Sequence, residues 1–364
     1  MRKTELAVIG GGPAGLSSAI TAMRQGAEVT LIDRDPVLGG QLIKQTHMFF
    51  GSKDQFASIR GIDIPSELIK ALEEGPGKVK VELGTTVIGY YDDGVILMEK
   101  DNRATTLLPQ RIIVATGAAE KMLPFPGNDL PGVYGAGAVQ TLMNVYGIKP
   151  GKRVLMVGAG NIGLIVSYQL LQAGVEVVAI IEAAPHIGGY LVHASKVRRA
   201  GVPIYTSCSI KEAFGRESVE GAVICRLDEN WQPLPGTEKT LELDVICLAV
   251  GLSPLTELLW QAGCKHKYVP ELGGYVPVRN EKMQTSIPYI YVAGDAAGVE
   301  EASSAMIEGK LAGLFAAASL GYDHDLESLA ATYRKELEEL RSGEAGSKIR
   351  QGLAKLIGGV SVAS

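Results

Sequence analysis

Two short glycine-rich segments are the first residues of this chain whose types and spacing point to chemistry. Each fits the pattern G-x-G-x-x-G, with Gly10, Gly12 and Gly15 in the first segment and Gly158, Gly160 and Gly163 in the second. In such a loop the first glycine permits a tight turn, the second lets the backbone approach a pyrophosphate, and the third brings a helix close to a strand. The N–H groups at the start of that helix then hold the phosphate charge. The two segments therefore predict two dinucleotide sites.

An acidic residue follows each segment at nearly the same distance. Asp33 lies 23 positions after Gly10, and Glu182 lies 24 positions after Gly158. Each acid ends an apolar run that predicts a strand, where a carboxylate can accept hydrogen bonds from the hydroxyls of a ribose. Glycine is common here, with 45 in 364 residues, so the bare glycine pattern would arise by chance about 0.7 times in the chain. The preceding strand, the following helix and the acid supply the specificity that the glycines lack.

The two segments belong to a longer internal repeat. Residues 7–42 align with residues 155–191, with one residue inserted in the second copy. Beyond the loops, Gly26, Pro36, Gly39 and Gly40 recur as Gly174, Pro185, Gly188 and Gly189. Two copies of one nucleotide-binding unit are the simplest explanation.

The elements that must position these loops indicate an α/β fold with two Rossmann-like dinucleotide-binding domains. Apolar or β-branched runs predict strands at residues 6–9, 27–32, 111–115, 203–206, 221–227, 243–250 and 290–293, besides one that begins at Val154. Helices are expected at residues 14–25 and 302–318. Residues 79–82, 86–91 and 94–99 predict a small antiparallel meander, and the prolines and glycines of residues 124–132 predict a linker.

Four further motifs follow in order along the chain. They are Gly39-Gly40-Gln41, Ala115-Thr116-Gly117, Ala249-Val250-Gly251, and Thr285–Pro288 leading to Tyr291-Val292-Ala293-Gly294-Asp295. Together with the two loops, they resemble the FAD-dependent pyridine nucleotide-disulfide oxidoreductase family in its compact, thioredoxin-reductase-like form. The resemblance covers about residues 5–320. In that family an inserted NAD(P) domain interrupts the FAD domain.

The resemblance implies a discontinuous FAD-binding domain at residues 1–119 and 251–322, an NAD(P)-binding domain at residues 120–250, and a helical tail at residues 323–364. The residues that it assigns to FAD are Gly10, Gly12, Pro13, Ala14, Gly15, Asp33, Arg34, Gly40, Gln41, Val87, Ala115, Thr116, Gly117, Gly294 and Asp295. Those that it assigns to NAD are Gly158, Gly160, Asn161, Ile162, Gly163, Glu182 and Gly251. Hydride transfer between nicotinamide and flavin needs positioning more than reactive side chains, so no catalytic side chain is assigned and no metal is expected.

The helix expected near residues 300–318 should begin close to the flavin, as in similar proteins, with its dipole stabilising the reduced ring. Glu300 and Glu301 would either tune the flavin potential or be ordinary acids of a first helical turn.

We expect NAD rather than NADP in the second site. Glu182 would accept a hydrogen bond from the 2′-hydroxyl and repel a 2′-phosphate. Lys196, Arg198 and Arg199 argue for NADP if they hold that phosphate, and carry no meaning if they form a solvated helix face.

The redox cysteine pair of the family's best-known members is missing. Cys208, Cys225, Cys247 and Cys264 are 17, 22 and 17 residues apart, so neither C-x-x-C nor C-x4-C occurs. Cys225 and Cys247 lie in apolar runs that are typical of buried structural thiols. Disulfide reduction is therefore disfavoured, and the electron acceptor should not be a disulfide.

Three functional interpretations stay open. The first is an FAD-dependent NAD(H):acceptor oxidoreductase. Residues 298–313, and the short segment after Gly321 in place of a large dimerisation domain, resemble the FAD/NAD subunits of proline-, opine- and sarcosine-oxidising enzymes. The second interpretation is therefore a subunit of an amino-acid or opine dehydrogenase complex, which needs a partner. The third is a non-catalytic flavin- or nucleotide-binding redox sensor.

Composition argues against other classes of partner. Lys and Arg number 35 against 40 Asp and Glu, a net charge of −5, which leaves no basic footprint for nucleic acid or an anionic membrane. No apolar run reaches the roughly 18 residues of a spanning helix, and the apolar stretch after Met1 is too short for a signal peptide. With four scattered cysteines, these features predict a soluble, cytoplasmic protein.

The tail carries an apolar stripe at helical spacing. Its members are Leu326, Leu329, Tyr333, Leu337 and Leu340, and residues 348–357 offer a second, basic amphipathic helix with Ile349, Leu353 and Leu356. Such a stripe must be buried. We expect an interaction element that contacts a second copy or a partner subunit, with packing onto the FAD domain as the alternative.

Overall fold

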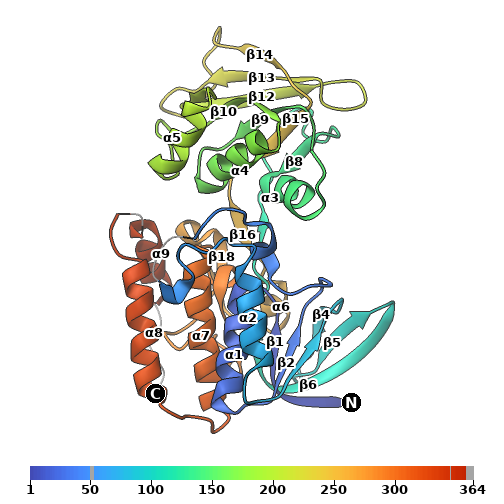
Figure 1. The fold of residues 1–364 in the computed structure, drawn as a ribbon, viewed down its shortest axis with the longest axis vertical. Helices are drawn as coiled ribbons and strands as arrows, with labels where there is room; N and C mark the ends of the chain where they lie inside the picture. Colours follow the sequence, from blue (N-terminus) through green and yellow to red (C-terminus); the bar gives the residue numbers. More distant parts are fainter. Residues whose placement is uncertain (50–52, 345, 358–364) are drawn as a thin grey trace. The chain divides into compact units, whose positions relative to one another are not determined.

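The computed structural model describes residues 1–49, 53–344 and 346–357, and Figure 1 traces their fold. The chain forms two compact units: the first unit is Met1–Ala119 with Ser253–Ser364, and the second unit is Glu120–Leu252. Each is built on a sheet of mainly parallel strands flanked by helices. The expected α/β class, with two Rossmann-like units of which the first is discontinuous in sequence, is confirmed.

The first unit is organised around a sheet of strand order β3-β2-β1-β6-β5-β4, to which β19 adds beside β6. Its strands are β1 (Arg2–Ile9), β2 (Val29–Ile32), β3 (Val79–Glu82), β4 (Thr86–Tyr90), β5 (Ile96–Lys100), β6 (Arg103–Val114) and β19 (Ile290–Val292). The pairs β1–β2, β2–β3, β1–β6 and β6–β19 are parallel, so their carboxyl ends meet at one edge. The end of β1 and all of β2 are buried, as a parallel sheet covered on both faces requires.

Strand β6 takes part in two kinds of pairing. It pairs antiparallel with β5 from Arg103 to Leu107, and parallel with β1 from Leu107 to Val114. The meander expected over residues 79–99 is therefore partly wrong. Residues 79–82 form β3, which pairs parallel with β2, whereas β4, β5 and β6 form the antiparallel part. Four alternating residues cannot distinguish an edge strand of a parallel sheet from a strand of a meander.

Helices α1 (Pro13–Gln25) and α7 (Ala302–Ala318) pack closely against each other in the first unit. Glycines on α7 make this approach possible. A Cβ added to Gly309 would lie 3.0 Å from the Cα of Ala14, and one added to Gly313 would lie 3.0 Å from the Cα of Ser18. Helix α2 (Ile64–Glu73) also contacts α1. Both helices expected from the sequence are confirmed, and their small residues explain the close contact.

The C-terminal helices fold back onto the first unit. Helix α8 (Leu326–Leu340) packs along α7 and buries Leu337 in the same core, and the rest of the stripe packs around it: Leu326, Leu329, Tyr333 and Leu340. Helix α9 (Ser347–Ile357) buries Leu356 in a smaller cluster with Val269, Leu272 and Val276. The amphipathic pattern is confirmed. This face packs on its own unit, which is the alternative that the sequence left open, and a contact of α8 or α9 with a second copy or a partner stays a prediction.

The second unit repeats the parallel sheet with strand order β11-β10-β9-β15-β8. These strands are β8 (Val133–Gly135), β9 (Arg153–Val157), β10 (Glu176–Ile181), β11 (Ile204–Tyr205) and β15 (Val245–Leu248), and its helices are α3 (Ala136–Gln140), α4 (Asn161–Gln172) and α5 (Leu191–Arg199). A separate antiparallel sheet contains β12 (Cys208–Phe214), β13 (Gly221–Arg226) and β14 (Lys239–Glu242), of which the sequence predicted only β13.

Short elements complete the chain. Strand β7 (Ala118–Glu120) pairs with β16 (Leu252–Pro254), and β17 (His266–Val269) pairs with β18 (Gly274–Pro277). Helix α6 (Glu257–Gln261) and the single-turn 3-10 helices η1 (Gly40–Lys44), η2 (Lys53–Gln55), η4 (Pro270–Leu272) and η5 (Gly294–Ala296) lie in the first unit, and a π-helical turn, η3 (Thr141–Val145), lies in the second. The expected linker at residues 124–132 contains neither helix nor strand. Within the described ranges, no helix is long and apolar enough to cross a membrane.

Candidate nucleotide-binding sites

The first glycine loop joins β1 to α1, and space around it requires the glycines. Gly10 has a φ of +108°, which side chains rarely adopt, and a Cβ there would overlap the carbonyl oxygen of Ala115. A Cβ on Gly15 would overlap the carbonyl oxygen of Gly10. Around Gly12 there is room, since the nearest atom lies 3.8 Å from an added Cβ. A phosphate can therefore approach the Gly12 backbone.

The second loop, between β9 and α4, has the same construction. Gly158 has a φ of +109°, and a Cβ there would overlap the carbonyl oxygen of Ala249. A Cβ on Gly163 would overlap the carbonyl oxygen of Gly158. Apart from its chain neighbours, no heavy atom of the described residues lies within 4 Å of a Cβ built on Gly160. The two copies of the repeat thus form the same glycine-rich cradle for a phosphate: a loop whose first and third glycines pack tightly and whose second glycine leaves space.

The acid of the first copy is tied to its own loop. The Asp33 carboxylate accepts hydrogen bonds from the N–H of Gly11 and, at 2.8 Å, from the N–H of Asp35. Burial raises the pKa of Asp33 above its usual value, against the lowering effect of both N–H groups. The backbone N–H of Thr85, the residue before β4, donates to the main-chain carbonyl of Asp33 at 2.9 Å, and Val87 is the second residue of β4. Arg34, assigned to the same site, has an exposed side chain.

The acid of the second copy makes equivalent contacts. The Glu182 carboxylate accepts hydrogen bonds from the N–H of Ala159 at 2.8 Å and from the N–H of Ala184 at 3.0 Å. Residues 183–195, which follow it, contain no lysine or arginine. Lys196 is the next cation, and its Nζ lies 5.6 Å from the centre of the Tyr168 ring. A positive charge for a 2′-phosphate is therefore missing directly after the acid.

Both loops fit the phosphates and the ribose of a dinucleotide such as FAD or NAD. Neither α1 nor α4 has an acidic residue in its first turn, so no negative charge competes with a phosphate at the helix start. The second glycine of each loop leaves space for a ligand. Each carboxylate oxygen has a further lone pair for a ribose hydroxyl.

Other residues assigned to FAD gather at the first loop. Pro13 and Ala14 open α1, and Gly40 packs on the loop, where an added Cβ would lie 2.7 Å from the Cα of Gly12. The φ of Gly40 is +52°. Gln41 follows in η1 with an exposed side chain.

The Ala115-Thr116-Gly117 turn leaves β6 directly beside the loop. The N–H of Ala115 donates to the carbonyl of Ile9 at 2.8 Å, and the Thr116 hydroxyl donates to the carbonyl of Leu255 at 2.7 Å. Gly117 has a φ of +78°, which a glycine tolerates.

The equivalent turn in the second unit follows β15. The N–H of Ala249 donates to the last carbonyl of β9 at 2.7 Å, and Gly251 has a φ of +118°. At the start of α4, the Asn161 side-chain oxygen accepts the N–H of Tyr190 at 2.8 Å, and Ile162 is 39% exposed. The turn after β15 and the start of α4 therefore flank the second loop, as the turn after β6 and the start of α1 flank the first loop.

Asp295 lies near the first loop because the residue before it, Gly294, packs against Ala14. A Cβ added to Gly294 would lie 2.8 Å from the Cβ of Ala14, so the Gly294 backbone packs closely against the Ala14 side chain. The Asp295 Oδ1 accepts the N–H of Glu300 at 3.2 Å, and Oδ2 accepts no hydrogen bond from the part of the chain that the structure describes. Burial raises the pKa of Asp295 to about 6, and the carboxylates of Glu308 and Glu300 add to that effect.

A buried ion cluster behind Asp295 escaped the sequence analysis. The Glu308 Oε1 accepts hydrogen bonds from Arg279 and Arg341, each at 2.7 Å, and its Oε2 accepts the N–H of Gly294 at 3.1 Å. Arg341 also binds Glu300, so that acid is neither free nor an ordinary member of a first turn. A lone glutamate in the middle of the largely apolar α7 was the one available signal.

The four cysteines are free and buried. Burial raises the pKa of Cys208 to about 11 and also raises the pKa of Cys225, Cys247 and Cys264. Such thiols stay protonated at neutral pH, which is the opposite of a redox-active cysteine. Among the described residues, no group of three His, Cys, Asp or Glu side chains could hold a metal ion.

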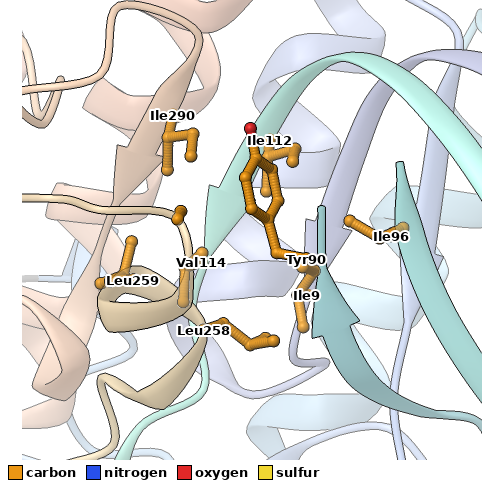
Figure 2. Close-up of a pocket in the computed structure, with 9 residues that line it drawn as sticks. Ile9, Tyr90, Ile96, Ile112, Val114, Leu258, Leu259 and Ile290 are labelled. Atoms are coloured by element: carbon orange, nitrogen blue, oxygen red, sulfur yellow. The ribbon is translucent and has the colours of Figure 1, made fainter. Parts of the chain in front are cut away.

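A small cavity in the first unit lies between α6, β4 and the parallel strands (Figure 2). Its lining consists of Ile9, Tyr90, Ile96, Ile112, Val114, Leu258, Leu259, Ala262 and Ile290. The one side-chain polar atom among these residues, the Tyr90 hydroxyl, bonds the Tyr289 hydroxyl at 2.9 Å. This cavity has no group to orient a polar substrate, so we assign it to packing.

Comparison with known sequences identifies related proteins. The profile of the family described as pyridine nucleotide-disulphide oxidoreductase matches residues 4–309. The HcnB subunit of hydrogen cyanide synthase from Pseudomonas aeruginosa is 26% identical over 84% of this chain and 69% of its own length. An opine oxidase subunit from Rhizobium meliloti is 29% identical over 92% of this chain and 75% of its own length. The alpha subunit of sarcosine oxidase from the same organism is 31% identical over 84% of this chain, which spans 29% of that protein.

Solved structures give the same fold. L-proline dehydrogenase from P. horikoshii superposes with a TM-score of 0.70 and 25% identity, covering 93% of this chain and 59% of that chain. Thioredoxin reductase from T. acidophilum superposes with a TM-score of 0.72 and 24% identity, covering 88% of this chain and 99% of that chain. The second likeness concerns the fold alone.

Proposed function

Because this chain belongs to the pyridine nucleotide-disulphide oxidoreductase family, we propose that it is an FAD-dependent oxidoreductase that exchanges a hydride with NAD(H). FAD would bind at the first loop with Asp33, and NAD(H) at the second loop with Glu182. The observation that carries this proposal is the duplicated cradle, in which the glycine conformations and the contacts of the acid recur.

The division of the chain follows from this assignment. Residues 1–119 and 251–322 would form the FAD-binding domain, and residues 120–250 the NAD-binding domain. Helices α8 and α9 would belong to the FAD-binding domain rather than to a separate tail, since their apolar faces are buried in the first unit.

The residues of this chain would bind and orient the two nucleotides. When bound, FAD supplies the chemistry of hydride exchange with a nicotinamide. The start of α1 would hold the FAD pyrophosphate, Asp33 would accept a hydrogen bond from the ribose, and Asp295 would accept one from the ribitol chain. Glu182 would bind the ribose diol of NAD and repel a 2′-phosphate. The expected preference for NAD rests on this charge and on the absence of a cation at residues 183–195.

The electron acceptor would not be a disulfide. All four thiols are buried, and burial raises the pKa of each one. A partner subunit or a small acceptor remains, and the relatives that are named as subunits favour the partner subunit.

The second candidate function is therefore the FAD/NAD subunit of an amine-, amino-acid- or opine-oxidising complex. HcnB and the relatives from opine oxidase and sarcosine oxidase are all named as subunits, and L-proline dehydrogenase is among the similar structures. In this case the chain would pass electrons between NAD(H) and a partner that oxidises the C–N bond.

One experiment tests both candidates. The purified chain should be yellow with one FAD per chain, and anaerobic NADH should bleach the flavin in stopped-flow spectroscopy. Dye reduction by NADH with the chain alone supports the oxidoreductase. Dye reduction driven by proline, an opine or sarcosine only after a partner flavoprotein is added supports the complex. Nucleotide binding without turnover would favour a sensor, and a colourless chain that ignores added FAD would contradict all of these.

A further inference from the structure

We propose that Arg341, at the end of α8, is a positioning residue for the FAD site: it fixes the segment Gly294–Glu301 against the first glycine loop. This inference rests on the proposed function, because it concerns FAD at that loop. It gives the C-terminal helices a role at the cofactor site, although they contribute no residue to the loop.

Arg341 is the cation that joins two acids. Its Nε lies 3.0 Å from both carboxylate oxygens of Glu300, and its Nη2 lies 2.6 Å from Glu300 Oε2 and 2.7 Å from Glu308 Oε1. The side chains of Arg341 and Glu308 are 11% and 4% exposed, so water screens this contact little. The planar guanidinium places two nitrogens in a fixed fork, so that Nε binds Glu300 while Nη2 binds both Glu300 and Glu308, whereas a lysine has one nitrogen on a flexible stem.

Glu308 transmits the contact to the turn before Asp295. Its Oε2 accepts the N–H of Gly294 at 3.1 Å. Gly294 in turn packs on Ala14, the second residue of α1. A shift of the Glu308 carboxylate would therefore move a backbone group that touches the phosphate-binding end of α1.

Glu300 transmits the contact to Asp295 itself. While the Glu300 side chain binds Arg341, its backbone N–H donates to Asp295 Oδ1 at 3.2 Å. This hydrogen bond leaves Oδ2 of Asp295 for a ligand hydroxyl. Arg341 thus holds the start of the segment, Gly294, through Glu308, and it binds Glu300 near the end of the segment directly.

The position of Arg341 depends on α9. Arg350 of α9 donates to the carbonyl of Arg341, and to the carbonyl of Gly343 at 2.9 Å. Helix α9 packs on Leu272, whose carbonyl accepts the N–H of Val299 at 3.0 Å. The last two helices therefore both reach the segment Gly294–Glu301: α8 through Arg341, and α9 through Leu272.

Charge, and not packing alone, makes Arg341 necessary. Arg279 and Arg341 balance Glu308 and Glu300 in this cluster. Without Arg341, Glu308 keeps Arg279, but Glu300 becomes an unpaired carboxylate next to Asp295. The Glu300 carboxylate acts on Asp295 electrostatically, since it raises the pKa of that acid. Without a cation between them, the two like charges in this partly buried site would repel each other and pull the segment away from the first loop.

The test measures FAD binding by the apo form of the full chain, by equilibrium dialysis and by quenching of flavin fluorescence. Arg341→Met should weaken FAD binding about tenfold, within the usual range for coupling between two sites. Arg341→Lys, which keeps the charge but not the fork, should weaken it less. Lys335→Met is the matched control, because Lys335 lies on α8 with 78% of its side chain exposed, and FAD binding should not change.

A second substitution separates charge from packing. Adding Glu300→Gln to Arg341→Met removes the unpaired carboxylate, so FAD affinity should return to within about threefold of the parent, a remaining difference that corresponds to less than 1 kcal/mol. A merely structural role of Arg341 predicts no rescue. If Arg341→Met alone does not fold, Arg341→Lys and the double variant are each compared with the parent, and the double variant should bind FAD at least as tightly as Arg341→Lys.

The outcomes distinguish this inference from the proposed function. If the parent chain binds no FAD, the proposed function fails. If the parent binds FAD and Arg341→Met binds it equally well, or if Glu300→Gln gives no rescue, the positioning role of Arg341 is overturned. Affinity for NAD⁺ should be the same in every variant, since the second loop belongs to the other unit.

Discussion

Asp33 and Glu182 hold the same place in the two copies of the repeat. Each carboxylate accepts the N–H of the residue after the first loop glycine, Gly11 or Ala159, and the N–H of the residue two positions after itself. The acid therefore ties the end of its strand to its own loop. The two sites can be perturbed separately, because the contacts of each acid stay within its unit.

Substitution of the two acids should give crossed effects. Asp33→Ala removes the ribose acceptor of the first site and should weaken FAD binding about 10- to 100-fold, the loss expected for hydrogen bonds to a charged group. Affinity for NAD⁺ should not change. Glu182→Ala should weaken NAD⁺ binding and leave FAD binding unchanged. Equilibrium dialysis with each nucleotide measures both affinities. A loss of FAD from Glu182→Ala, with the fold intact, would contradict the assignment of the loops.

The second site should prefer NADH to NADPH in kcat/KM for flavin reduction. The negative charge of Glu182 opposes a 2′-phosphate, and no cation lies in residues 183–195. Glu182→Gln keeps the shape and removes the charge, so the preference should fall about tenfold. Lys196→Ala is the control, since Lys196 lies over Tyr168. A parent enzyme that prefers NADPH would reverse the assignment.

The cysteines should be dispensable for electron transfer. Replacing all four by alanine should leave dye reduction by NADH largely unchanged, with some loss of stability from the small cavities. In the native parent, iodoacetamide should label the thiols very slowly at pH 8, because a pKa of about 11 for Cys208 leaves about a thousandth of it as thiolate. Activity lost without loss of fold or of FAD would reveal a redox thiol.

Asp295 should make the apo protein less stable as the pH rises. Its pKa is about 6 in the folded chain against a usual value of 3.8, so the folded state binds the proton more tightly. Its contribution to the free energy of unfolding is complete below about pH 4 and is lost as the pH rises to about 6. Asp295→Asn does not titrate. The free energy of unfolding of Asp295→Asn relative to that of the parent should therefore be about 2 kcal/mol higher at pH 7.5 than at pH 4, as measured by urea unfolding. An equal difference at both pH values would contradict this.

Truncation after Tyr322 should destabilise the FAD site. It removes α8 and α9, uncovers the apolar face of α7 and takes away Arg341. Differential scanning calorimetry should show a melting temperature several degrees lower, and FAD should be lost on dialysis. A stable yellow fragment of lower oligomeric mass would instead support the tail as an interaction element.

The duplicated cradle was predictable from sequence because its parts are local. A glycine with positive φ, a helix start and a strand-end acid all lie within about 25 residues, and their spacing follows from the length of one strand–helix–strand unit. Gly10 and Gly158, with φ of +108° and +109°, show how closely the two copies agree.

The ion cluster was not predictable, because its members come from distant parts of the chain. Arg279, Glu308 and Arg341 follow no common period: Arg279 lies just after β18, Glu308 lies on α7 and Arg341 directly follows α8, so only tertiary packing brings them together. The apolar stripe of α8 illustrates a related limit. Its spacing shows that one face is buried, but spacing alone does not identify the covering surface, which is α7.

The parallel pairing of β19 with β6 also has a consequence for biosynthesis. It joins Ile290 to Ile112, with the whole of the second unit between them in sequence. On the ribosome, every strand of the second unit's parallel sheet has been made once Leu248 is synthesised, whereas the first sheet still lacks β19, and α1 still lacks α7. Domains generally fold as units during translation. The second nucleotide loop can therefore rest on a finished sheet while the first is incomplete, so the two sites should mature in the opposite order to that in which their loops are translated.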